Sequence, residues 1–274
     1  HSWDVAVMTR PGCTITMVSK TQWSISVVLL FILLTSLNYS QAAMTDPATG
    51  IAFAPRIQEE KEIVGVGVRK KGPIKIYSVG MYVHEDILKE SLLESSVSSD
   101  KSPLDILRER ATASASTLPT DSPVSTEEEE TKPSKVGTSF VLKMNFKVGA
   151  DKMASAIAES VIPRYSQDHG KNADGPTSTA VASDVETLKD LIAKGIDGAA
   201  TKGTILQFDC TSEGLGVCIN GKEQGVVPSR ELAKAFCDIY LDEKSVSPTL
   251  RASCLETLSS IPATVVNKEG DNES

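Results

Sequence analysis

The sequence predicts a domain of the α+β class, an open-faced sandwich in which a large antiparallel sheet is covered by a layer of helices. Three observations lead to this prediction. Two segments with strand-like alternation, 62–69 and 74–83, follow one another across a short turn. Helical periodicity appears later, at 150–165, and a second strand pair at 204–220 separates two groups of helices. An order of strands, helices, strands and helices is typical of α+β domains.

Composition and charge narrow the function classes. The chain has 274 residues, of which 40% are hydrophobic, and a formal net charge of -8. The apolar content is sufficient for a packed core. The acidic balance argues against a general nucleic-acid binder and against attraction to anionic membranes. With three histidines and no P-loop, nucleophile elbow or HExxH motif, we expect neither a metal nor a cofactor.

Residues 1–43 are predicted to be a targeting segment. The apolar run Ile25–Leu37 follows Lys20 and precedes small residues, which is the pattern of a secretory signal peptide. An uncleaved anchor is the alternative, although the run is shorter than the roughly 20 residues that a membrane span needs. Ala52–Pro55 resembles the cleavage motif of plastid-bound precursors in algae with secondary plastids. The expected destinations are therefore the secreted or endomembrane route and a plastid.

Residues 44–93 are expected to form the first part of the domain. Segment 62–69 alternates strictly, and segment 74–83 is rich in residues that favour strands. A turn at Lys70–Pro73 joins the two into a hairpin. A short helix is expected next, through Ile87, Leu88 and Leu92.

Residues 94–135 differ in composition from the rest of the chain. They are dominated by Ser, Thr, Pro and Glu and carry no sustained apolar period. We predict a disordered acidic insertion, because such a segment buries too little apolar surface to fold. The domain resumes at 136–261, and the tail 262–274 is also predicted to be disordered.

The second part of the domain is expected to begin with a strand at 139–147 and the helix at 150–165. Pro163 predicts an early end for this helix. Its apolar face is formed by Met153, Ile157 and Val161.

A polar loop is expected at 166–182. Ser183 and Glu186 then form a capping box that opens the next helix, which ends at Gly195 or Gly198.

The rest of the chain is predicted to hold a hairpin and two helices. Strands at 204–210 and 216–220 pair, and Asn220–Gly221 is a turn. Ser229 caps one helix, and Pro248 opens the last.

Two interpretations of the cysteines are open. Cys210 and Cys218 flank a predicted hairpin turn, so a cross-strand disulfide is one. The other is that the cysteines are free thiols packed as small hydrophobic residues. No CxxC pair is present, which argues against a zinc ribbon.

The first hairpin carries an unusual cation. Arg69 occupies the same strand face as Gly65 and Gly67, so the glycines leave space beside it. A guanidinium in such a space binds a carboxylate with two parallel hydrogen bonds. Tyr77 shares this face if the turn has three residues, and points the opposite way if it has two. The alternative is an ordinary Arg at a strand end and a tyrosine of the core.

The segment GVGVRKKGPIKIYSVGMYV, residues 65–83, resembles the opening hairpin of the chalcone isomerase-fold family. The later segments agree in order. Ser229–Leu241, followed by Val246–Pro248, is similar to the C-terminal helices of the family. The resemblance covers most of 50–260 and implies the chalcone isomerase-like fold.

The resemblance also allows the active site of true chalcone isomerases to be compared residue by residue. Their Arg polarises the substrate carbonyl region and matches Arg69. Their Thr position corresponds to Tyr77, and their Tyr and Asn positions to Met153 and Ser160. Because three of the four polar groups differ, and Met153 cannot donate a hydrogen bond, flavonoid cyclisation is not expected.

An Arg followed by a Tyr is instead the pattern of the non-catalytic, fatty-acid-binding branch of the family. The resemblance implies that Arg69 and Tyr77 clamp a carboxylate. The candidate apolar wall for the acyl chain is formed by Met153, Ile157 and Val161, for which core packing is the alternative.

Three functions follow, and the resemblance favours the first. A non-catalytic carrier binds a fatty acid or similar apolar carboxylate through Arg69 and Tyr77. An intramolecular lyase acts on a chalcone-like enone with Arg69, Tyr77 and Ser160. A scaffold without ligand has a collapsed pocket, in which Arg69 pairs with an internal carboxylate.

Overall fold

The computed structural model describes residues 43–58, 60–97, 101–112, 137–169 and 178–261. Apart from residue 43, the expected targeting segment lies outside these ranges, as does the tail from 262. The statements below concern the described ranges.

A large antiparallel sheet covered by helices confirms the predicted α+β class. Seven strands lie in the order β11-β10-β9-β6-β5-β4-β3, and every neighbouring pair is antiparallel. Their bounds are Arg56–Ile57 (β3), Lys61–Lys71 (β4), Ile74–His84 (β5), Gly137–Met144 (β6), Ile205–Thr211 (β9), Gly214–Ile219 (β10) and Lys222–Val227 (β11). Two short pairs accompany the sheet: Met44–Thr45 (β1) with Ala52–Phe53 (β2), and Val148–Gly149 (β7) with Ala199–Ala200 (β8).

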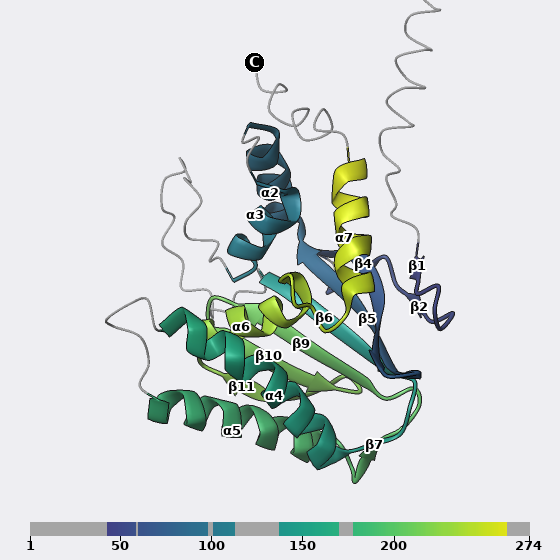
Figure 1. Cartoon of the computed structure of the whole chain (residues 1–274), viewed down its shortest axis with the longest axis vertical. Helices are drawn as coiled ribbons and strands as arrows, with labels where there is room; N and C mark the ends of the chain where they lie inside the picture. Colours follow the sequence, from purple (N-terminus) through teal and green to yellow (C-terminus); the bar gives the residue numbers. More distant parts are fainter. Residues whose placement is uncertain (1–42, 59, 98–100, 113–136, 170–177, 262–274) are drawn as a thin grey trace, which may run out of the picture. The chain divides into compact units, whose positions relative to one another are not determined.

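The helices pack on one face of this sheet, with α6 across its middle and α7 over the β4 side (Figure 1). Their bounds are Glu85–Val97 (α2), Pro103–Arg110 (α3), Ala150–His169 (α4), Ser178–Gly195 (α5), Arg230–Leu241 (α6) and Pro248–Ser260 (α7). The main hydrophobic core fills the space between sheet and helices. A smaller cluster on the opposite face contains Phe53, Ile63, Val66, Tyr82 and Val141.

Helix α7 covers the free edge of β4. Strand β3 pairs with only the first two residues of β4, so the later backbone groups need other partners. The amide of Val66 donates to Ser253 Oγ at 3.2 Å, and the amide of Val68 to Thr249 Oγ1 at 3.0 Å. Two strand residues span about 6.6 Å and four helical residues about 6 Å, so the two hydroxyls match successive edge amides.

The glycines of β4 permit this close approach. A Cβ on Gly67 would lie 2.2 Å from the backbone nitrogen of Leu250, and one on Gly65 2.5 Å from Cys254 Sγ. The space that the sequence suggested for a ligand beside Arg69 is thus filled by α7 at both glycines. That expectation was wrong, because the glycines serve packing between helix and strand.

The segment from 94 corrects the predicted insertion. Helix α2 continues to Val97, and α3 lies within the range for which we expected disorder. Ser102 caps α3 and Pro103 occupies its first turn, while Leu104, Ile106 and Leu107 are buried. The apolar residues of this short helix are too few to give a clear period in a Ser-rich context. Residues 113–136 lie outside the described ranges.

Helix α4 runs through Pro163 to His169, so the predicted early end was wrong. Contacts beyond the proline hold the helix. Arg164 donates to both carboxylate oxygens of Asp242, at 2.7 and 3.0 Å. The Tyr165 hydroxyl donates to Asp184 at 2.6 Å and contacts Ser229 at 3.0 Å. These tertiary contacts outweigh the one backbone bond that proline removes.

Two further expectations need correction. Helix α5 begins at Ser178, so Ser183 lies inside it and the loop predicted at 166–182 is largely helical where it is described. Strand β11 was not predicted, because Lys222–Val227 is mostly exposed and does not alternate.

The other predicted boundaries are largely confirmed. Asn220 and Gly221 both have positive φ, at 49° and 78°, and connect β10 to β11. Helix α5 ends at Gly195, and the Ser229 side chain accepts from the amide of Leu232 at the start of α6. Pro248 is the first residue of α7.

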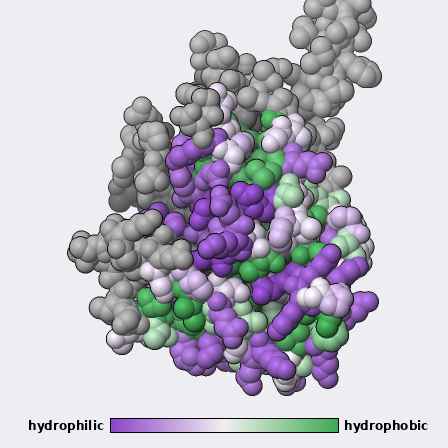
Figure 2. Space-filling view, viewed as in Figure 1, coloured by the Kyte–Doolittle hydropathy of each residue, from purple (hydrophilic) through white to green (hydrophobic). Residues whose placement is uncertain are grey.

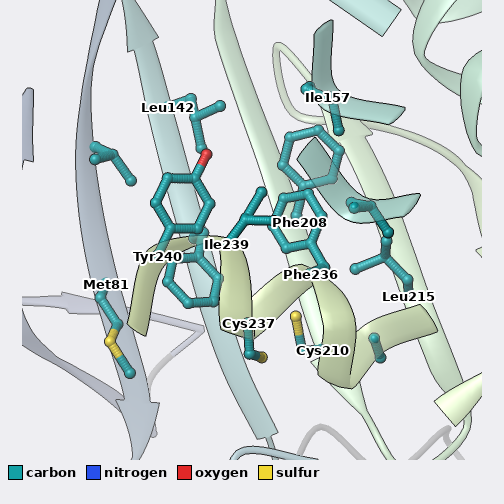
Figure 3. Close-up of a cluster of buried hydrophobic side chains, with 14 of the residues drawn as sticks. Met81, Leu142, Ile157, Phe208, Cys210, Leu215, Phe236, Cys237, Ile239 and Tyr240 are labelled. Carbon is teal, nitrogen blue, oxygen red and sulfur yellow. The ribbon is translucent and has the colours of Figure 1, made fainter. Parts of the chain in front are cut away.

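The disulfide suggested for Cys210 and Cys218 is absent. In the register of β9 and β10, Cys210 lies opposite Leu215 and Cys218 opposite Gln207. Both cysteines are free thiols, and Cys210 is buried beside Cys237 of α6 (Figure 3). The pKa of Cys210 is raised well above its ordinary value, mainly by burial and secondly by the neighbouring Cys237 thiol.

Among the described helices, none combines the length and the apolarity that a membrane-spanning segment requires.

Gly67→Ala is expected to lower the free energy of unfolding by about 1–3 kcal/mol, because the new Cβ meets the backbone of α7. Gly216→Ala is the matched control, since a Cβ there would lie 3.5 Å from its nearest neighbour, an ordinary contact. Urea unfolding of both variants checks this. Equal stability of the two variants would contradict the packing role of Gly67.

Candidate functional site

A cavity of about 870 Å³ lies between the first half of α4, the end of the β4–β5 hairpin and the segment that leads from β6 to α4. Its apolar lining comes from all three parts and from α6. These residues are Ile74, Ile76, Tyr77, Phe146, Val148, Met153, Ala156, Ile157 and Ile239. Arg69 lines the cavity from β4.

Arg69 and Tyr77 lie directly opposite each other in the hairpin. The turn has only two residues, Gly72 and Pro73, since Lys71 pairs with Ile74. A two-residue turn alone would direct the Tyr77 side chain to the other face. A register shift between Arg69 and Lys70 adds one residue to β5 and restores the shared face.

The Tyr77 hydroxyl is buried beside a second phenol. It lies 3.0 Å from the Tyr240 hydroxyl, and Arg69 lies opposite Tyr77 across the hairpin. Burial raises the pKa of Tyr77, and the Arg69 cation opposes this rise. Burial, together with Tyr77, raises the pKa of Tyr240 well above its ordinary value. Both phenols are therefore neutral at physiological pH and can donate hydrogen bonds.

Aromatic rings fill the core behind this pair. Tyr240 stacks on Phe140 with ring centroids 4.8 Å apart, and Phe236 packs against Phe208 at 4.5 Å. Figure 3 shows Phe208, Phe236 and Tyr240 packed together, with the Tyr240 hydroxyl near Leu142. Tyr77 lines the cavity and Tyr240 does not, so the aromatic core lies behind the cavity wall.

The structure brings together the five residues proposed as a site. Met153 and Ile157 are buried and line the cavity from α4, and Ser160 lines it farther along the same helix. The Ser160 hydroxyl donates to the carbonyl of Ala156 at 2.8 Å. Val161 is fully buried and not part of the lining, which agrees with the core-packing alternative.

Sequence reasoning missed Tyr240 and Phe146. Tyr240 was assigned from the sequence only to the apolar face of a helix. Its hydroxyl could have indicated a polar contact in the core, because a buried tyrosine hydroxyl needs a hydrogen-bond partner. Phe146 was placed in a strand, but β6 ends at Met144.

The lining is basic although the chain is acidic. The cations are Arg69, Lys70, Lys71, Lys147 and Lys152, and the acids are Asp151 and Glu159. No ion pair joins Arg69 to a carboxylate within the described ranges. The guanidinium is partly buried, so it faces the cavity without the internal partner that the scaffold hypothesis requires.

A second hollow, of about 660 Å³, lies between α4 and α5. Figure 2 shows hydrophobic surface over these two helices, and Ala158, Ile162, Val181 and Val185 contribute to it. The only cation in its lining, Lys189, is paired with Glu186 at 2.7 Å. Among the described residues, this hollow therefore has no unpaired cation that could bind a carboxylate. No group of metal-ligating side chains is found in the described part of the chain.

Comparisons with known proteins agree with this architecture. Residues 59–255 match the family model described as chalcone isomerase like. The chain is similar to the crystal structure of a fatty-acid binding protein from Arabidopsis thaliana, with a TM-score of 0.59 and 19% identity, over 82% of this chain and 99% of that one. At this identity the likeness concerns the fold. No curated protein matches the chain.

Tyr77→Phe is expected to lower the free energy of unfolding by about 1–3 kcal/mol, because the buried Tyr240 hydroxyl loses the partner it has in the structure. Tyr77→Phe/Tyr240→Phe removes both hydroxyls and should cost less than the sum of the single substitutions. Urea unfolding of all three variants forms the cycle. A double variant that loses at least the sum would show that the two hydroxyls do not support each other.

Proposed function

Because the chain belongs to the chalcone isomerase-like family, we propose that it is a carrier that binds a fatty acid or a similar apolar carboxylate at Arg69. One observation carries the proposal. A guanidinium with no carboxylate partner in the described ranges lies on the wall of a cavity that also has apolar side chains from the hairpin, α4 and α6. The name of the structural neighbour, a fatty-acid binding protein, supports the same ligand class.

In this proposal the carboxylate of the ligand accepts hydrogen bonds from both strands of the hairpin, from Arg69 in β4 and from Tyr77 in β5. Arg69 supplies two parallel N–H donors and the positive charge. Tyr77 donates its hydroxyl hydrogen, since its raised pKa keeps the phenol protonated. Tyr240 can then donate to the Tyr77 oxygen across 3.0 Å, which keeps every hydroxyl satisfied when the ligand is bound.

The hydrocarbon part of the ligand lies along the first half of α4. Met153 and Ile157 face it from the helix, and Ile76 and Val148 from the sheet side. The cavity volume of about 870 Å³ is within the usual range for pockets that hold small ligands, about 300–1,000 Å³. An apolar chain placed there leaves water as its carboxylate is fixed.

The residues at the matching isomerase positions do not favour catalysis. A cyclising enzyme needs a general base as well as hydrogen-bond donors around the cation, and Tyr77 supplies a donor but no base, because its raised pKa keeps the phenol protonated. Met153 offers neither, and the Ser160 hydroxyl is bonded to its own helix. We therefore propose binding without chemistry.

Arg69→Gln is expected to weaken the binding of palmitate about 10- to 100-fold, as expected for the loss of a charged hydrogen-bonding group. Titration calorimetry of the purified chain measures the change. Arg230→Gln, an exposed arginine at the start of α6, is the control and should bind as the wild type does. Equal affinity in Arg69→Gln and wild type would overturn the proposed function, and so would chalcone turnover that Arg69→Gln abolishes.

Ala156→Trp is expected to weaken palmitate binding at least tenfold, because the new ring occupies the cavity from an exposed helix position. The melting temperature should change little, since Ala156 is not part of the core. Ala193→Trp on α5 lies outside the lining and serves as the control. Unchanged affinity in Ala156→Trp would place the ligand elsewhere.

A further inference from the structure

We infer that the mouth of this cavity is a docking surface for an anionic membrane, from which the carrier takes its ligand. The inference rests on the proposed function for the identity of the cargo, but the docking surface is tested without cargo. The surface is the rim formed by Lys70, Lys71, Ile74, Phe146, Lys147 and Lys152, all of which line the cavity.

The four lysines of the rim form a cluster of unpaired cations. All four are exposed, and within the described ranges none of them makes an ion pair. Lys101 and Lys189 elsewhere on the described surface are paired with glutamates at 2.8 and 2.7 Å, whereas Lys194, Lys222 and Lys244 are unpaired there but do not line this cavity. The rim is therefore distinguished by its group of cations around one opening. Asp151 and Glu159 are the acids of the cavity lining, so cations outnumber them at the mouth.

Two large hydrophobic side chains lie among these lysines. Ile74 is 42% exposed and Phe146 is 48% exposed. The backbone brings them to the same end of the sheet, since the amide of Phe146 donates to the carbonyl of Ile76 at 3.1 Å. Apolar side chains surrounded by lysines are typical of surfaces that insert into the headgroup region of a bilayer.

The net charge of the chain predicts no attraction to anionic membranes, but docking depends on the charge that faces the bilayer. At physiological salt, charges separated by more than about 8 Å are largely screened. Acidic residues distant from the rim therefore do not cancel the local group of four lysines, which Asp151 and Glu159 offset only in part. Each lysine near an anionic surface adds to the binding free energy, and this contribution is lost when the lysine is replaced by a neutral residue.

A bilayer fits this surface better than an acidic protein does. The proposed cargo is an apolar carboxylate, which partitions into membranes because its hydrocarbon chain leaves water. The exposed Ile74 and Phe146 stand at the opening through which such a chain would enter. An acidic protein would need the lysines but would leave these two side chains unexplained.

The experiment is sedimentation of the ligand-free chain with sucrose-loaded vesicles. One set of vesicles is pure phosphatidylcholine. The other contains phosphatidylserine at about 30 mole per cent, which gives the surface a negative potential. We expect binding to the anionic vesicles, weaker binding to the neutral vesicles, and loss of binding at high salt.

Charge-matched variants test the location. Lys70→Gln/Lys71→Gln/Lys147→Gln should bind anionic vesicles about 100-fold more weakly, at about fivefold for each lysine. Lys194→Gln/Lys222→Gln/Lys244→Gln has the same net charge and alters exposed lysines outside the rim, so it should bind as the wild type does. Phe146→Ser should weaken binding about tenfold without changing the charge. Equal binding by the two triple variants would overturn the inference.

The outcomes separate this inference from the proposed function. Palmitate binding in solution without vesicle binding would overturn membrane docking alone. An acidic protein would then be the better candidate for the partner of the rim. Vesicle binding without palmitate binding would overturn the carrier function alone. Binding to both vesicle compositions with equal strength would contradict the role of the lysines.

Discussion

The cross-strand contact between Arg69 and Tyr77 is the interaction on which the candidate site depends. It exists because one extra residue in β5 compensates for a turn of only two residues. The same bulge determines which face the Tyr77 hydroxyl reaches, and so its contact with Tyr240 in α6. Helix packing, the wall of the cavity and the position of the cation are thus linked through one irregularity of the sheet.

The sequence was informative where a local pattern had a local cause. The alternation of the first hairpin, the positive-φ pair Asn220–Gly221 and the Ser229 cap each follow from chemistry within a few residues. Arg69 and Tyr77 were identified by their spacing and by the family resemblance. The direction of Tyr77 was left open, because a bulge has no reliable signal in residue types and is decided by tertiary packing.

The incorrect predictions share a cause. Helix α4 passes Pro163 because Arg164 and Tyr165 are bound by residues far away in sequence. Helix α3 forms in a segment of disordered composition because other elements bury its few apolar residues. In each case tertiary contacts, which single-sequence patterns do not contain, outweighed the local preference.

The two hydroxyls of α7 that hold the amides of Val66 and Val68 have a further consequence. A strand with open backbone donors is a template for a strand from another molecule. Here the template is concealed by side chains of a C-terminal helix, which can separate from the sheet without breaking any strand pair. Detachment of α7 would therefore expose open strand donors together with the buried side chains of Leu250, Cys254 and Leu258, so this helix conceals both a strand edge and part of the core.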